Sequence, residues 1–215
     1  MKTLVLDFDG TIADTRNSIV QTVQYTAKEL GMSDVNESDI INLIGLPLKN
    51  TLLQALHISN EKLLEEAVAL YRAKYNEISM GTIELFPNVE KTLKIIYNQG
   101  IAITIASNKG RNSLTSSLSK LGIIQYFSLI LGVEDVLNKK PAPDMVLRIL
   151  EETNATPRET LVVGDTTYDI LMGQQANCIT CGVTYGNHSE NQLKAQKADY
   201  IIDDFIKITD IIKMI

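Results

Sequence analysis

Two aspartates near the start of the chain, Asp7 and Asp9, stand two positions apart at the end of the apolar stretch LVLDFDGT. A carboxylate that leaves water at the end of a buried strand must be paired, neutralised or bound to a metal ion, because its desolvation is costly. Gly10 and Thr11 follow directly, and a glycine at this point lets the chain turn abruptly away from the strand. We therefore expect a cation at this position.

Three later stretches place polar side chains after apolar runs. SNKG carries Ser107 and Asn108, NKKP carries Lys140, and GDTTYD carries Asp165 and Asp169. If the preceding strands are parallel, their carboxyl ends lie at one edge of a sheet, which is where such sheets bind ligands. Three or four carboxylates, a hydroxyl and a lysine would then converge.

Mutual repulsion opposes such a cluster of carboxylates unless a cation lies among them. Magnesium fits best, because it takes oxygen ligands in octahedral geometry from one or two carboxylates and leaves positions for a substrate phosphate. These strand ends offer no histidine or cysteine to suit zinc, and the spacing of a calcium-binding EF-hand is absent. The sequence therefore predicts a Mg²⁺ site.

The elements that position these residues alternate along the chain. Most of the strand candidates are continuous apolar runs, as is typical of parallel strands buried on both faces. A helical pattern opens at Pro87 and stops before Gly100, and others separate the remaining runs. This alternation predicts an α/β fold with a doubly wound, Rossmann-like parallel sheet. The expected strands are residues 2–8, 101–107, 127–133, 160–165, 178–183 and 199–203.

One long interval, residues 15–82, has only helical patterns. One apolar helix face begins at Ile19, and another follows an expected N-cap at Asn60. A crossover between parallel strands needs only a dozen or so residues, so we interpret the interval as an inserted all-helical cap domain. The expected core then consists of residues 1–14 and 83–215, with the cap over the ligand edge of the sheet.

The motifs DFDGT, SN, KP and GDTTYD, in this order and at these separations, resemble those of the haloacid dehalogenase superfamily. LFPNVEKTLK, KKPAPD and GVTYG are similar to its phosphoglycolate phosphatase-like branch. The resemblance covers essentially the whole chain, including the helical cap. It implies a magnesium-dependent phosphatase that hydrolyses a small phosphate monoester, of the phosphoglycolate kind, through an aspartyl-phosphate intermediate.

The resemblance also implies a role for each acidic residue. Asp7 would be the nucleophile that attacks phosphorus. Asp9 would protonate the leaving group and then activate water as a base. Mg²⁺ would be held by the Asp7 carboxylate, the Asp9 main-chain carbonyl and Asp165. Asp169 would act on the metal through water or by supporting its ligands.

The phosphoryl oxygens would be held by the Ser107 hydroxyl, the main-chain amide of Asn108 and the Lys140 ammonium. Thr11 is a further candidate for phosphate binding, with a helix-capping role as the alternative. Lys140 is also the expected counter-charge of the carboxylates.

Substrate choice is expected to lie in the cap. Lys49 follows a GLP turn that resembles the cap loop facing the site in relatives, and we hypothesise that Lys49, with Arg16 at the hinge, meets a second anionic group of the substrate. Tyr71 and Tyr75 are expected to pack within the cap and not to face the site.

Other activities share these residues. Inorganic pyrophosphatase and sugar-phosphate phosphatase or mutase activity remain alternatives, although mutases of this kind usually carry Glu-Asp where this chain has Gly164-Asp165. A dehalogenase has no use for an acid at Asp9. A receiver-type signalling module also carries a phosphoacceptor aspartate on a doubly wound sheet, but it needs neither Asp9 nor a seventy-residue insertion.

The composition of the chain limits the classes of partner that we expect it to bind. The net charge of −6 and pI near 5.0 argue against a nucleic-acid partner. No run of 18 apolar residues predicts a membrane span, so we expect a cytoplasmic protein, monomeric or homodimeric, that acts on a small phosphorylated metabolite. Cys178 and Cys181 stand three apart on an expected strand, about 10 Å between α-carbons, whereas a disulfide tolerates about 7 Å. We expect neither a disulfide nor a zinc site there.

Overall fold

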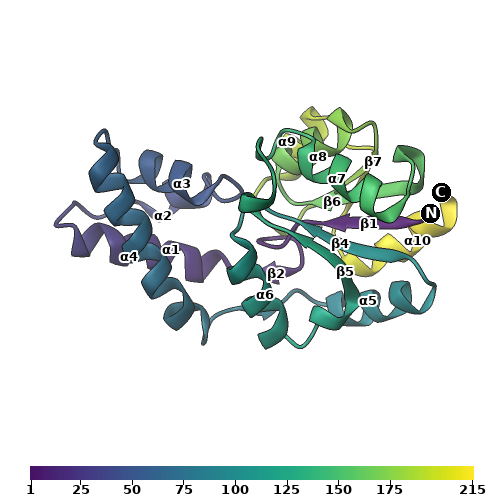
Figure 1. Ribbon diagram of the computed structural model, residues 1–215, viewed down its shortest axis with the longest axis horizontal. Helices are drawn as coiled ribbons and strands as arrows, with labels where there is room; N and C mark the ends of the chain where they lie inside the picture. Colours follow the sequence, from purple (N-terminus) through teal and green to yellow (C-terminus); the bar gives the residue numbers. More distant parts are fainter.

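A six-stranded sheet is the frame of the protein, and the computed structural model describes all 215 residues (Figure 1). The strands lie in the order β5-β4-β1-β6-β7-β8, and every neighbouring pair is parallel. Each lies within one of the expected ranges, so the predicted doubly wound α/β sheet is confirmed. The strands are β1 (Thr3–Leu6), β4 (Ala102–Ala106), β5 (Phe127–Leu131), β6 (Thr160–Gly164), β7 (Ile179–Val183) and β8 (Tyr200–Ile202).

Helices cover both faces of the sheet, because successive side chains of a strand point to opposite sides. Val5 and Val162 pack against α7 (Asp144–Thr153) and α8 (Thr167–Gln175). The opposite face of the same strands packs against α5, α6 and α10. Those helices are α5 (Val89–Asn98), α6 (Arg111–Lys120) and α10 (Ile208–Met214), and the short elements are α9 (Glu190–Ala195), η1 (Ile124–Tyr126), η2 (Val133–Asp135), η3 (Pro157–Glu159) and η4 (Phe205–Lys207).

Between β1 and β4 the chain forms a second body of helices, seen at the left of Figure 1. The Asn60 side chain accepts hydrogen bonds from Lys62 N and Leu63 N, so the expected N-cap is confirmed. Ala27 and Ala67 are fully buried where the first and last of these helices pack together. We call α1 (Arg16–Glu29), α2 (Glu37–Ile41), α3 (Leu48–Ala55) and α4 (Glu61–Ser79) the helical segment.

The chain enters and leaves the helical segment through two short strands that pair with each other. β2 (Ala13–Asp14) runs antiparallel to β3 (Glu84–Leu85). The two connections to the sheet are therefore side by side, which places the helical segment beyond the carboxyl end of β1.

The two cysteines are both free and buried, Cys178 just before β7 and Cys181 within it. Burial raises the pKa of both thiols to about 12, so neither is a thiolate at neutral pH. No helix combines the length and the apolar character needed to cross a membrane.

The packing of the sheet predicts a contrast between two leucines. Leu161 in β6 is fully buried, whereas Leu137 is 87% exposed. Leu161→Ala should lower the free energy of unfolding by about 3–5 kcal/mol because it leaves a cavity in the core. Leu137→Ala should change it by less than about 0.5 kcal/mol. Urea unfolding followed by circular dichroism measures both, and equal values would contradict the assigned core.

Candidate active site

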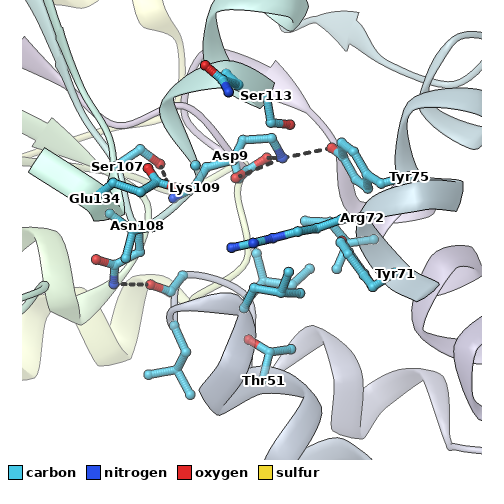
Figure 2. A pocket seen from close by; sticks show the side chains of 18 of the residues that line it. Asp9, Thr51, Tyr71, Arg72, Tyr75, Ser107, Asn108, Lys109, Ser113 and Glu134 are labelled. Atoms are coloured by element: carbon cyan, nitrogen blue, oxygen red, sulfur yellow. Dashed lines mark hydrogen bonds and ion pairs between the residues drawn. The ribbon is translucent and has the colours of Figure 1, made fainter. Parts of the chain in front are cut away.

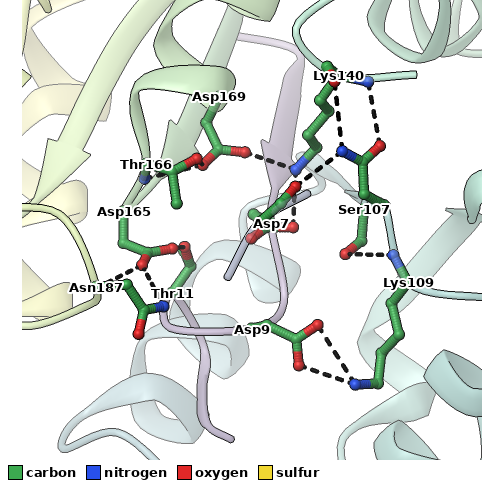
Figure 3. A network of polar contacts seen from close by, with 12 residues as sticks. Asp7, Asp9, Thr11, Ser107, Lys109, Lys140, Asp165, Thr166, Asp169 and Asn187 are labelled. Carbon is green, nitrogen blue, oxygen red and sulfur yellow. Dashed lines mark hydrogen bonds and ion pairs between the residues drawn. The ribbon is translucent and has the colours of Figure 1, made fainter. Parts of the chain in front are cut away.

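The carboxyl ends of three strands bring the predicted polar residues to one edge of the sheet (Figure 3). Asp7 follows β1, Ser107 follows β4, and Asp165 follows β6. These strands are adjacent, since β1 lies between β4 and β6. The main chain therefore brings together residues that lie far apart in the sequence.

A buried ammonium group, that of Lys140, lies between two carboxylates. Lys140 Nζ is 2.7 Å from Asp7 Oδ1 and 2.6 Å from Asp169 Oδ1. All three side chains are at most 4% exposed. Burial alone would lower the pKa of Lys140, but the carboxylates of Asp169 and Asp7 raise it above its ordinary value. Lys140 is therefore charged, and it is the counter-charge that the sequence predicts.

Burial also raises the pKa of the Asp7 carboxyl, to about 6, and the neighbouring carboxylates of Asp169 and Asp9 add to this effect. Lys140 opposes the shift without cancelling it. A further cation at this place would favour the ionised form of Asp7.

Asp165 is fully buried and accepts three hydrogen bonds. The Thr11 hydroxyl donates to Oδ1 at 2.9 Å, and Asn187 donates to Oδ2 from its main-chain N at 2.7 Å and from its side chain at 2.9 Å. Burial, reinforced by the charges of Asp169 and Asp7, still raises the pKa of Asp165 to about 8. The Thr11 hydroxyl thus supports a carboxylate in this structure, and its predicted role in phosphate binding stays a prediction. Asn187 carried no signal in the sequence.

The three carboxylates form a set suited to a hard cation. Asp7, Asp165 and Asp169 each offer an oxygen, and these atoms all lie within 4.8 Å of one another. Both carboxylate oxygens of Asp169 are engaged, because Lys140 Nζ donates to Oδ1 and the N and Oγ1 of Thr166 donate to Oδ2 at 3.0 and 2.7 Å. Oxygen donors in a buried cluster fit Mg²⁺.

Two glycines make room for these carboxylates. A Cβ atom on Gly164 would fall 2.2 Å from Asp169 Cγ. Gly10 has φ +85°, which favours glycine, and a Cβ there would lie 2.3 Å from Asp165 Oδ2. Gly10 in the DFDG turn therefore has two effects: it lets the chain turn away from β1, and it leaves space for the carboxylate of Asp165.

The Asp9 carboxylate is held apart from this cluster by Lys109. Lys109 Nζ is 3.0 Å from Asp9 Oδ1 and 3.4 Å from Oδ2, and it donates to the Tyr75 hydroxyl at 2.8 Å (Figures 2 and 3). The same ammonium lies 4.2 Å from the centre of the Tyr75 ring. No role is predicted for Lys109 from the sequence, although it directly follows Ser107 and Asn108. Tyr75 was expected only to pack, and that expectation is wrong.

A cavity of about 340 Å³ separates the sheet edge from the helical segment (Figure 2). Asp7, Asp9 and Ser107 line its sheet side, and Tyr71 and Tyr75 line its other side. Tyr71 therefore also faces the cavity, contrary to expectation.

Asn108 joins the two sides of the cavity. Its side chain donates to the main-chain oxygen of Gly45 at 2.8 Å, and its Oδ1 accepts from Lys140 N at 3.1 Å. Ser107 Oγ accepts from Lys109 N at 3.3 Å. Both residues thus lie at the cavity, with Asn108 also fixing the lysine loop.

The structure does not bring Lys49 or Arg16 to the cavity. Lys49 is half exposed and pairs with Glu61, at the start of α4. Arg16 donates to Gly186 O at 2.7 Å and to Asn187 Oδ1 at 3.4 Å. Each of these two cations is thus held by another partner, and the hypothesis that they meet the substrate stays a prediction.

The raised pKa values of this site predict how stability depends on pH. In a chelating buffer, Asp165 binds its proton up to about pH 8 when folded but only up to about pH 4 when unfolded, so this contribution to stability is lost as the pH rises between these values. Asp165→Asn should therefore flatten the fall of Tm between pH 5 and 8. The exposed Asp210→Asn should keep the wild-type slope. Parallel curves for the wild type and Asp165→Asn would contradict the assignment.

The comparisons with known proteins agree with this geometry. A model of the haloacid dehalogenase-like hydrolase family matches residues 4–183. The protein named "Probable phosphatase IndB" of Dickeya dadantii is 35% identical over 97% of this chain and 92% of its own, and the pyrophosphatase PpaX of Oceanobacillus iheyensis is 33% identical over 100% and 97%. A crystal structure described as a predicted phosphoglycolate phosphatase from Haemophilus somnus superposes with a TM-score of 0.92, at 25% identity, over 98% of this chain and 97% of that one.

The resemblance that the four motifs indicate is thus confirmed over nearly the whole length. The parallel sheet, the motif order and the phosphatase names of these relatives agree with one another. The chain belongs to the haloacid dehalogenase-like hydrolase family and is a phosphatase-type hydrolase of that family.

Proposed function

We propose that this protein is a magnesium-dependent phosphatase that hydrolyses a small phosphate monoester through an aspartyl-phosphate on Asp7. The observation that carries the proposal is the position of Asp7 in the cavity wall, held by Lys140 at 2.7 Å while Asp9 enters the same cavity. A carboxylate fixed in this way can attack phosphorus in line, because it does not have to reorganise.

The cation belongs beside the nucleophile. Asp7, Asp165 and the main-chain carbonyl of Asp9 would hold Mg²⁺, with Asp169 supporting the set through Lys140. When bound, the ion neutralises Asp7 against the incoming phosphate dianion and offsets charge on the transferring phosphoryl group.

The residues of the chain itself divide the reaction into two stages. Lys140, the Ser107 hydroxyl and the main-chain amide of Asn108 hold the phosphoryl oxygens while Asp7 forms the bond to phosphorus. Asp9 gives a proton to the departing oxygen of the ester. It then takes a proton from the water that attacks the phosphorus of the aspartyl-phosphate, which releases inorganic phosphate and restores Asp7.

The helical segment would act as a cap over this reaction. We assign residues 15–82 to the cap and residues 1–14 and 83–215 to the catalytic core, with the β2–β3 pair as the hinge. Two contacts join the halves across the cavity, Asn108 to Gly45 and Lys109 to Tyr75. Closing this cavity limits the access of water until the intermediate has formed.

The substrate class is a small phosphorylated metabolite, since a cavity of about 340 Å³ has no room for a macromolecule. A phosphoglycolate-like ester is the first candidate, as the name of the Haemophilus somnus protein suggests. Inorganic pyrophosphate is the second, favoured by the likeness to the pyrophosphatase of Oceanobacillus iheyensis.

The experiment that tests the proposal is phosphate release from 2-phosphoglycolate, pyrophosphate and phenyl phosphate, each with Mg²⁺ and with a chelator. Turnover should require Mg²⁺, and Asp7→Asn should abolish it because the variant has no nucleophile. Asp210→Asn, which changes an exposed aspartate, should retain wild-type rates. A stable phosphorylated wild-type protein without turnover would contradict the proposal and favour a receiver-type module.

The two stages predict a specific behaviour of Asp9→Asn. With p-nitrophenyl phosphate, whose leaving group needs no proton, the variant should release about one nitrophenol per enzyme in a burst and then turn over about 100-fold or more slowly, because water is no longer activated. With 2-phosphoglycolate no burst of glycolate should appear. Rapid-quench kinetics measures both, and equal bursts with the two esters would exclude Asp9 as the general acid.

A further inference from the structure

Arg72 is a cation of the cavity that the proposed reaction does not use. It lies on α4, and its guanidinium points into the cavity from the helical segment (Figure 2). Its side chain forms no ion pair with any residue of the protein. The two lysines of the site differ in this respect, because Lys109 is paired with Asp9 and Lys140 with Asp7 and Asp169.

The acids in the cavity wall are already engaged. Asp9 binds Lys109, Asp7 binds Lys140, and Glu134 accepts a hydrogen bond from Arg111 N at the start of α6. Arg72 is therefore the available positive charge on this wall. A guanidinium presents a planar fork of donors that matches a carboxylate or a phosphate in two parallel hydrogen bonds.

The chemistry of the proposed reaction places the leaving group of the substrate on the side of the cavity where Arg72 lies. Asp9 must reach the departing oxygen, so the rest of the substrate extends from Asp7 past Asp9 toward the helical segment. There the wall carries Arg72 and, one helical turn later, Asn76. Ser113, near the start of α6, adds a hydroxyl to the same space.

We propose that this wall is a subsite for a second anionic group, so that the preferred substrate carries a carboxylate or a phosphate on its leaving group and Arg72 binds it. The inference rests on the proposed phosphatase function and deepens it. It also replaces Lys49 and Arg16, the cations that the sequence suggested for this role, by one that faces the cavity.

The test compares specificity ratios in Arg72→Gln. The substrates are 2-phosphoglycolate, with a carboxylate on the leaving group, pyrophosphate, with a phosphate, and phenyl phosphate, with neither, all at saturating Mg²⁺. The kcat/KM for the preferred anionic substrate, relative to that for phenyl phosphate, should fall about 10- to 100-fold, the size of a lost charge-assisted contact. Arg72→Lys should restore part of the ratio, since it keeps the charge and loses the fork.

A matched control has the same substitution elsewhere. Arg158 lies exposed in η3, before β6 and so at the opposite edge of the sheet, and Arg158→Gln should leave every ratio as in the wild type. A fall confined to 2-phosphoglycolate identifies a carboxylate as the bound group, and a fall confined to pyrophosphate identifies a phosphate. Unchanged ratios in Arg72→Gln, or an equal loss with all three substrates, would overturn the subsite.

The outcomes separate this inference from the proposed function. If the wild type hydrolyses phenyl phosphate with Mg²⁺ and Asp7→Asn does not, the proposed function stands whatever Arg72→Gln does. If the wild type hydrolyses none of the three substrates, both are overturned.

Discussion

The site depends on one constraint, the accumulation of negative charge at the carboxyl ends of β1 and β6. Asp7, Asp165 and Asp169 are each at most 4% exposed, and their oxygens approach one another closely. Lys140 is the buried side chain of opposite sign among them, and its two ion pairs tie strand β1 to helix α8. A buried ion pair of this kind gives little net stability, because desolvation offsets the attraction. Its value is positional, since it fixes two carboxylates from distant parts of the chain relative to each other.

One ammonium group does not balance three carboxylates, and the protein shows the imbalance in its raised pKa values. Burial and mutual repulsion hold the proton on Asp165 to about pH 8 and on Asp7 to about pH 6. A divalent cation bound among these carboxylates would complete the balance of charge and would ionise Asp7 at the same time. Charge neutralisation and activation are thus one property of the site, and the glycines that let the carboxylates approach so closely are part of it.

The sequence predicts the sheet and the four strand-end motifs well, because continuous apolar runs and the punctuation around them are local signals. Asp7, Ser107 and Asp165 stand immediately after three of those strands, and Lys140 lies in the loop that follows β5. Residues whose roles depend on how the helical segment lies over the sheet were not predictable. Lys109 and Tyr75 meet across the cavity from different elements, and no periodicity along α4 distinguishes a tyrosine that packs from one that also reaches the site.

Thr11 and Lys49 are placed differently from expectation for the same reason. Each has the right chemistry for binding an anion, and each instead satisfies a nearer partner, Asp165 for the hydroxyl and Glu61 for the ammonium. A short motif shows which type of side chain stands at a position, but it does not show which neighbouring groups bind that side chain in the folded protein. Arg72 shows the converse, because an arginine within an ordinary amphipathic helix carries no signal of its own until its surroundings are known.

The pairing of β2 with β3 has a consequence for evolution as well as for movement. Both connections between the sheet and the helical segment pass through this two-stranded antiparallel pair. The hydrogen bonds between the strands of the six-stranded sheet therefore do not depend on the helical segment. Exchange of everything between Asp14 and Glu84 for another compact insert would leave the strand register and the carboxylate cluster intact. The helical segment could therefore change as rapidly in sequence as a surface loop does. The carboxylate cluster at the edge of the sheet would stay as restricted in sequence as the buried core.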